Sequence, residues 1–285
     1  MADPLAETAA RLRALVPGFP DTYDVVRRPT GPGWVRLDAV PVATWCAEAL
    51  RRGNPRKLAS VAATAVGGAL VHAVLARVTA ALALDTRAWD LGAHTVAVHR
   101  APEGHLDRVA VRPPVWVVAG DPAAGPRDVA PVRVFPDEAA LLDALAAAAV
   151  ATLSPLLGDV RAATRFGLVP LWNAAGDAVR LTAEMVPRYA GRAPRPELAP
   201  TFLDALVDHG APIRGRGVEQ PLPGRPERVP VRAACCLAFR TDPPVTRAAD
   251  ALCTTCPLLG ATERARRYTT FLDALRPGGS SGPVR

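Results

Sequence analysis

Four of the five cysteines lie within 22 residues towards the C-terminal end of the sequence. Cys235 and Cys236 are adjacent, and Cys253 and Cys256 form a Cys-x-x-Cys pair that Pro257 follows. Thiolates are ligands for soft or borderline metals, so this set predicts tetrahedral zinc or an iron–sulfur cluster. A disulfide is the third alternative, although clustered cysteines in a cytoplasmic protein more often bind metal.

The adjacent pair favours the larger of the two metal centres. Neighbouring side chains of an extended chain point to opposite sides, so Cys235 and Cys236 reach one small ion only where the backbone kinks. A two-iron cluster offers two metal corners, and a proline after the last ligand also occurs in bacterial iron–sulfur sequences. The spacing therefore favours iron–sulfur over structural zinc, and zinc over unrelated thiols. Cys46 lies far from this group and is interpreted as a small buried hydrophobe.

Composition and charge narrow the class of protein. With 285 residues, 49% of them hydrophobic and 21% charged, the chain is expected to fold into a globular protein. The net charge of +7 favours an anionic partner or substrate. The basic residues are scattered and no nucleic-acid-binding signature is present, so we expect no nucleic-acid partner. No G-x-G-x-x-G or G-x-x-x-x-G-K-[ST] motif occurs, so dinucleotide and NTP sites have no support. No coherent Ser-His-Asp set or pair of catalytic carboxylates is evident from spacing, so hydrolase chemistry has no support either.

One apolar stretch could be either a transmembrane helix or a core helix. Residues 58–76 contain no Asp, Glu, Lys or Arg and are long enough to cross a bilayer. They are rich in Ala, Gly and Thr, contain His72, and have few Leu or Ile, which predicts a buried core helix instead. The N-terminal residues lack the features of a secretory signal. We therefore expect no transmembrane segment and a cytoplasmic location, with peripheral association at the inner face of the membrane as the alternative.

The elements that must position the cysteines are mainly helical. Apolar periodicity and capping residues predict helices at residues 42–51, 58–76, 139–153, 169–189, 196–209 and 261–275. Short β-branched runs predict strands of a small antiparallel sheet at residues 94–99, 108–112, 115–119 and 132–135. The predicted fold class is α+β, with a predominantly helical body at 1–210 and a short metal-binding module at 211–285, joined through a Pro/Gly-rich segment.

The cysteine segment resembles a known family. Cys-Cys-Leu-x-x-Arg, from Cys235 to Arg240, followed by Cys-x-x-Cys-Pro-Leu, from Cys253 to Leu258, is similar to the C-terminal motif of the FhuF-like ferric siderophore reductases. Within the body, the run that begins Leu-Trp-Asn at residue 171 resembles the Leu-Trp-Gly-Asn pattern of that family. The chain departs from the family in lacking that glycine and in a longer gap of sixteen residues, which we interpret as an insertion near residues 243–244.

This resemblance implies a [2Fe–2S] cluster bound by Cys235, Cys236, Cys253 and Cys256. It also implies an enzyme that reduces Fe(III) in a hydroxamate-type siderophore by one electron and releases Fe(II). The cysteines would be metal ligands and not acid–base groups. The candidate substrate or cluster contacts are Arg240, Trp172 and Asn173. The simpler interpretation of Arg240 is a solvated surface side chain, and that of Trp172 is a side chain of the core.

Two further expectations concern partners and alternatives. Because no flavin or nicotinamide motif is evident, we expect electrons to come from an external donor, namely a ferredoxin, a flavodoxin or a reductase. Two other functions remain open on sequence grounds. One is a zinc-stabilised binding module, and the other is a [2Fe–2S] electron carrier or sensor with a different role.

Overall fold

The computed structural model describes residues 4–15, 25–52, 54, 56–124, 131–237, 240 and 252–274. Its α-helices are α1 (Pro4–Ala14), α2 (Val42–Arg51), α3 (Ala59–Val71), α4 (Arg77–Asp85), α5 (Glu138–Thr164), α6 (Leu168–Tyr189), α7 (Leu198–Asp208) and α8 (Ala261–Ala274). Three short helical segments are η2 (Leu37–Ala39), η3 (His72–Ala76) and η4 (Pro122–Ala124). The strands are β1 (Val25–Val26), β2 (Trp34–Arg36), β3 (Ala88–Trp89), β4 (Val96–Arg100), β5 (Leu106–Val111), β6 (Val115–Val118), β7 (Val132–Phe135), β8 (Val218–Pro221) and β9 (Arg228–Val231). The expected α+β class with a predominantly helical body is confirmed.

The strands form three small sheets where one was expected. Their orders are β1-β5-β4-β2, β3-β6-β7 and β8-β9. Four of the pairings are antiparallel, as expected, whereas β1 pairs with β5 and β6 pairs with β7 in parallel. Short β-branched runs identify strands by their side-chain pattern, but that pattern says nothing about which strand each one pairs with.

The centre of the molecule is the continuous apolar rod formed by α3, η3 and α4. It packs against α2, α5 and α6, and Leu70, Leu75 and Leu82 along it are completely buried. Gly67 on α3 permits the close approach of α6, because a Cβ at this position would lie 2.8 Å from Cδ2 of Leu171. The core helix predicted at residues 58–76 is therefore present, and it continues beyond the predicted end.

Two stretches of the described chain, Ala59–Asp85 and Glu138–Thr164, are long and apolar enough to cross a membrane. Their most apolar windows are 61% and 50% buried inside the molecule. Core helices show the same length, composition and burial, so these properties are weak evidence for a membrane span.

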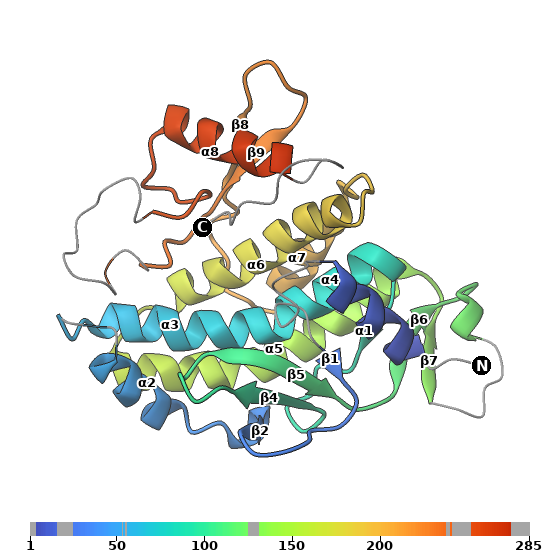
Figure 1. The fold of residues 1–285 in the computed structure, drawn as a ribbon. Helices are drawn as coiled ribbons and strands as arrows, with labels where there is room; N and C mark the ends of the chain where they lie inside the picture. The colour runs from blue at the N-terminus through green and yellow to red at the C-terminus, as the bar shows by residue number, and fades with distance from the viewer. Residues whose placement is uncertain are drawn as a thin grey trace.

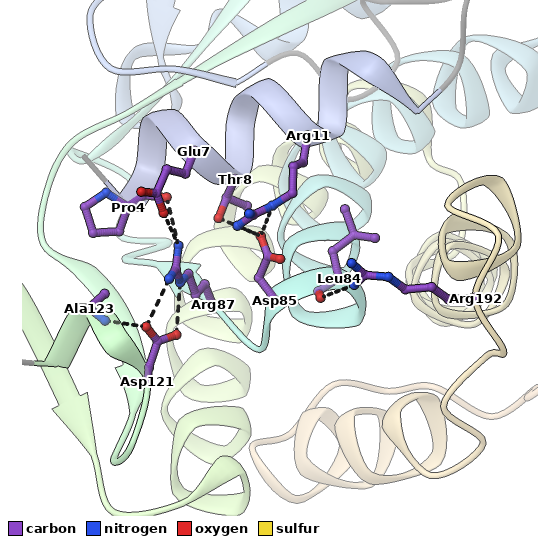
Figure 2. A network of polar contacts seen from close by, with 10 residues as sticks. All are labelled: Pro4, Glu7, Thr8, Arg11, Leu84, Asp85, Arg87, Asp121, Ala123 and Arg192. Atoms are coloured by element: carbon purple, nitrogen blue, oxygen red, sulfur yellow. Dashed lines mark hydrogen bonds and ion pairs between the residues drawn. The ribbon is translucent and has the colours of Figure 1, made fainter. Parts of the chain in front are cut away.

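The N-terminal helix α1 is attached to the body by a network of ion pairs (Figure 2). The buried guanidinium of Arg87 pairs with Glu7 on α1 at 3.0 Å and with Asp121 at 2.9 Å. Nearby, Arg11 on α1 pairs with Asp85, at the end of α4, at 2.7 Å. Since Arg87 and Asp121 are both largely shielded from solvent, this network fixes the position of α1 more firmly than a surface ion pair would.

The last elements, β8, β9 and α8, lie against α6 on the side of the helical layer away from β4 and β5 (Figure 1). Met185 of α6 packs against the small apolar cluster between the β8–β9 hairpin and α8, and the Tyr189 ring meets Phe271 edge-on at 6.0 Å. Most of the segment between the two cysteine pairs, including the expected insertion near residues 243–244, lies outside the described residues. The domain boundary at residues 210–211 stays a prediction.

Candidate metal centre

The four cysteines come together because two separate arms of the chain run side by side. The first arm leaves β9 and reaches Cys235 and Cys236 four residues later. The second arm contains Cys253 and Cys256 and enters α8. The amide of Arg232 donates a 3.0 Å hydrogen bond to the carbonyl of Thr255, which joins the arms just before the cysteines.

The thiols meet in two contacts, and each contact joins one arm to the other. The side chain of Cys236 is hydrogen-bonded to Cys253, and that of Cys235 to Cys256. All four are free cysteines. Cys256 is buried in a small apolar cluster with Leu252 and Leu259, and the half-buried Cys235 and Cys253 pack against this cluster. Cys236 is also half-buried. A cysteine cluster of this kind can bind a metal ion or an iron–sulfur cluster.

The backbone turns sharply immediately after the adjacent pair. Leu237 has a φ of +56°, a left-handed conformation that costs a residue with a side chain about 1–2 kcal/mol. This turn directs the amide of Leu237 back to the sulfur of Cys235, 3.5 Å away. The backbone therefore bends directly after Cys236, and backbone strain of this kind concentrates at functional sites.

Proximity and burial disfavour ionisation of the thiols when no cation is present. The hydrogen bond with Cys236, followed by burial, raises the pKa of Cys253. Burial is the main cause that raises the pKa of Cys235. Neighbouring thiolates repel one another, and a metal cation would supply the compensating positive charge as it displaced the protons. The donor set therefore fits a metal-bound state.

The arrangement of the thiols also bears on the kind of metal centre. In the described part of the chain, no group of three or more His, Cys, Asp or Glu side chains is placed to hold a metal ion. Across the arms, Cys235 interacts with Cys256 and Cys236 interacts with Cys253, and within each arm the two cysteines also interact with one another.

Asp177 on α6 fixes the start of the first arm. Its carboxylate is 1% exposed and accepts hydrogen bonds from the amides of Ala233 and Ala234, at 2.8 and 2.9 Å. The guanidiniums of Arg180 and Arg232 lie 3.6 and 3.7 Å from its oxygens. A buried carboxylate needs such partners, and here they place the chain directly before Cys235.

Arg232 brings a positive charge to the thiols. Burial would lower the pKa of its guanidinium, but Cys236, Cys253 and Asp177 together raise that pKa. The guanidinium is also hydrogen-bonded to Cys253. It therefore stays charged beside the pair of thiols that contains Cys236 and Cys253.

A second arginine, Arg264 on α8, holds the Cys-x-x-Cys turn. It is 7% exposed, and its guanidinium donates to the carbonyl of Cys256 from Nε at 3.3 Å and from Nη2 at 3.1 Å. It also donates to the carbonyl of Leu259 and to the side chain of Gln220 on β8. One buried side chain thus ties the turn, the hairpin and α8 together.

The other residues singled out from the sequence have different surroundings. Trp172 is 2% exposed and belongs to the main core. Asn173 accepts hydrogen bonds from the amides of Arg214 and Gly215, both at 3.0 Å, and so holds the segment that leads to β8. Arg240 is half-buried, and its amide donates to the carbonyl of Leu237 at 2.8 Å.

Sequence reasoning missed the three residues that support the site, Asp177, Arg232 and Arg264. One signal was available, because Asn173 and Asp177 are four residues apart and so share a face of a predicted helix. Polar side chains on an otherwise apolar helix face indicate buried hydrogen-bond partners. No comparable signal marked either arginine among the 34 basic residues of the chain.

No family model, curated protein or solved structure matches the chain in the three comparisons made.

Proposed function

We propose that this chain is a ferric siderophore reductase with a [2Fe–2S] cluster bound by Cys235, Cys236, Cys253 and Cys256. It reduces the Fe(III) of a hydroxamate-type siderophore and releases Fe(II) in the cytoplasm. The observation that carries the proposal is the clustering of the four thiols, with contacts across the arms between Cys235 and Cys256 and between Cys236 and Cys253. The choice of reaction, reduction of a ferric siderophore, is inferred from the resemblance of residues 235–258 to the FhuF-like motif.

The two pairs support an iron–sulfur cluster over zinc. A structural zinc site needs four ligands around one point. A [2Fe–2S] cluster needs two thiolates at each of two irons, and two pairs of thiols match that requirement. Cys235, Cys236, Cys253 and Cys256 would together hold such a cluster.

The surrounding residues suit a redox centre. When bound, the cluster supplies a couple that accepts and donates one electron. The amide of Leu237 donates to the sulfur of Cys235, and the guanidinium of Arg232 lies against Cys253. Both groups stabilise negative charge on sulfur, and hydrogen bonds to the sulfurs are among the factors that set the potential of such clusters.

The reaction follows from the preferences of iron for its ligands. Hydroxamates hold Fe(III) through hard anionic oxygens, whereas Fe(II) is softer, less charged and held far less tightly. Addition of one electron to the substrate therefore favours release of its iron. No acid–base residue is needed for this step.

The electron donor is an external protein in this proposal. Ferredoxins and flavodoxins are acidic, and the net charge of +7 favours their association with this chain. Salt screens such attraction, so we expect the rate of reduction by an acidic carrier to fall as ionic strength rises. A rate that is independent of salt would contradict electrostatic docking.

The test is release of Fe(II) from a ferric trihydroxamate, with a ferrous chelator as indicator and a chemical or protein reductant. Wild-type protein should turn over, and Cys253→Ser should lose both the visible absorbance of the cluster and turnover. Cys46→Ala is the matched control, because Cys46 is a buried thiol, 1% exposed, on α2 and outside the four-cysteine group. Turnover that survives Cys253→Ser would contradict the assignment.

The same assay separates the alternatives. A colourless protein that contains zinc and releases no Fe(II) would be a zinc-stabilised binding module. A coloured protein that contains the cluster and exchanges electrons, but leaves ferric trihydroxamate intact, would be an electron carrier or sensor.

A further inference from the structure

A pocket of about 260 Å³ lies between α3 and α6, next to the four-cysteine group. Its apolar wall includes Gly68 and Ala178, and its polar wall consists of His72, Thr182, Tyr189 and Arg232. Every one of these polar side chains can donate a hydrogen bond, and no carboxylate is among the described residues that line the pocket. Such a lining suits a ligand that presents acceptor oxygens on a compact and partly apolar body.

Arg232 joins this pocket to the candidate metal centre. It lines the pocket and is also hydrogen-bonded to Cys253. A ligand that contacts its guanidinium is therefore separated from the thiols by a single side chain. Asp177 lies 3.7 Å from Nε of the same guanidinium and restrains it from the side of α6.

His72 and Tyr189 present donors that the protein itself leaves unused. Neither ring is hydrogen-bonded to any residue in the described part of the chain. His72 is exposed and begins η3, a π-helical segment, and such segments are frequent at functional sites. Burial raises the pKa of Tyr189, which keeps its phenol protonated and able to donate.

We propose that this pocket binds the oxygen-rich, iron-binding head of the ferric substrate, with its oxygens directed at Arg232, His72 and Tyr189. The inference rests on the proposed function and adds the place where the substrate docks. Ligand pockets that enclose a whole small molecule have volumes of about 300–1,000 Å³. A volume of about 260 Å³ therefore accommodates the head or one arm of a siderophore and leaves the remainder in solvent.

The chemistry at this position is a transfer of one electron. A cluster held by the four cysteines would supply the electron that converts the bound Fe(III) to Fe(II), and the external donor protein would replace that electron. No covalent bond to the protein forms or breaks. The Fe(II) then leaves its weakened oxygen ligands.

Two helical glycines provide a matched test. A Cβ added at Gly68, in the pocket wall, or at Gly158, on α5, meets no atom within 4 Å. Both positions are half-buried, and Gly158 does not line the pocket. Gly68→Leu should fill the pocket, whereas Gly158→Leu adds the same side chain to a helix elsewhere.

The direct measurement is binding of tris(acetohydroxamato)gallium(III), which cannot be reduced, to cluster-loaded protein by calorimetry. We expect Gly68→Leu to weaken this binding at least tenfold, and to raise KM for the iron complex similarly, with an unchanged visible spectrum. Gly158→Leu should match wild type. Tyr189→Phe, which removes only the hydroxyl, should weaken binding about threefold to tenfold, as expected for one hydrogen bond.

The outcomes separate this inference from the proposed function. Equal gallium binding by wild type and Gly68→Leu, or no binding by wild type, would overturn the docking site even if Fe(II) release were observed. Absence of Fe(II) release from cluster-loaded wild-type protein would overturn the proposed function, whatever the result with gallium.

Discussion

The body of the molecule and its C-terminal part are stabilised in different ways. One continuous apolar cluster extends through the body from Leu5 to Ile213. The C-terminal part has two separate clusters, one of five buried residues around Tyr268 and one of three around Cys256. Between and around these small clusters, the chain is held by buried polar groups, chiefly Asp177 and Arg264.

This difference indicates which part of the fold would gain most stability from a bound cofactor. Burial of apolar surface stabilises a protein by about 25 cal/mol per Å², and small modules with little core need metals or other cross-links. The body has the core of an ordinary globular protein, whereas the described C-terminal part has only small apolar clusters and buried polar contacts. In the proposed function, a metal bound by the four cysteines would add a cross-link between the two arms as well as a centre for electron transfer.

The largest effect should follow removal of the metal. Chelation, or Cys253→Ser, should lower the hydrogen-exchange protection of amides in β9 and α8 by orders of magnitude, because metal binding and folding are coupled in small modules. Amides of α3 and α5 should keep their protection, since their stability comes from the core of the body. Exchange measured by mass spectrometry resolves these segments. A uniform loss of protection across the whole chain would contradict the division into two regions.

The next effect should come from Asp177→Ala. Removal of the carboxylate leaves two amides and two guanidiniums with one partner fewer at a buried position, which should cost about 3–5 kcal/mol and prevent assembly of the metal site. Unfolding in urea, with iron analysis of the same samples, measures both effects. Glu184→Ala on the same helix is the control. The partly exposed ion pair between Glu184 and Arg188, at 2.6 Å, contributes less than about 1 kcal/mol to stability. An equal loss of stability and of bound iron in the two variants would contradict the role of Asp177 in holding the first arm.

A smaller effect is expected for Arg264→Leu. The carbonyls of Cys256 and Leu259 lose their donor, and buried acceptors without partners cost about 1–3 kcal/mol. The loss should appear as faster release of the metal to a chelator, because the Cys-x-x-Cys turn is held less firmly. Arg266, an exposed arginine on the same helix that pairs with Glu263 at 2.6 Å, provides the comparison. An Arg266→Leu variant that released metal as fast as Arg264→Leu would exclude a specific role for Arg264.

The smallest effect should occur in the body. Gly158→Ala adds a methyl group to α5 where no atom lies within 4 Å, and should raise the free energy of unfolding by about 0.5–1 kcal/mol through helix propensity. Gly67→Ala should give no such gain, because its Cβ would lie 2.8 Å from the Leu171 side chain. Thermal unfolding of the two variants distinguishes open from packed surfaces of the body. Equal stabilisation by both would show that α3 and α6 are not closely packed.

Much of this architecture is predictable from the sequence because it is local. Apolar periodicity predicted α2 at its observed bounds, and α6, α7 and α8 to within two residues at each end. The helix predicted to end near residue 153 instead continues to Thr164, past Pro155. A proline removes one hydrogen bond from a helix, and burial of Leu157 and Val160 beyond it compensates.

The remainder depends on contacts between distant residues. The parallel pairing of β6 with β7 and the separation of the sheets depend on how the strands pack on the helices. The four cysteines were identifiable because ligand chemistry limits the residue types at a metal site. The two amides that donate hydrogen bonds to Asp177 are 56 and 57 positions away in the sequence. No spacing rule connects such residues, so the support of the site appears only in the structure.

The most direct test of the central claim is a visible spectrum of anaerobically purified protein, with iron, sulfide and zinc measured on the same sample. The account predicts a coloured protein with about two iron and two sulfide per chain, and absorbance that dithionite bleaches. A colourless protein with one zinc per chain would contradict it and leave the four cysteines a purely structural role.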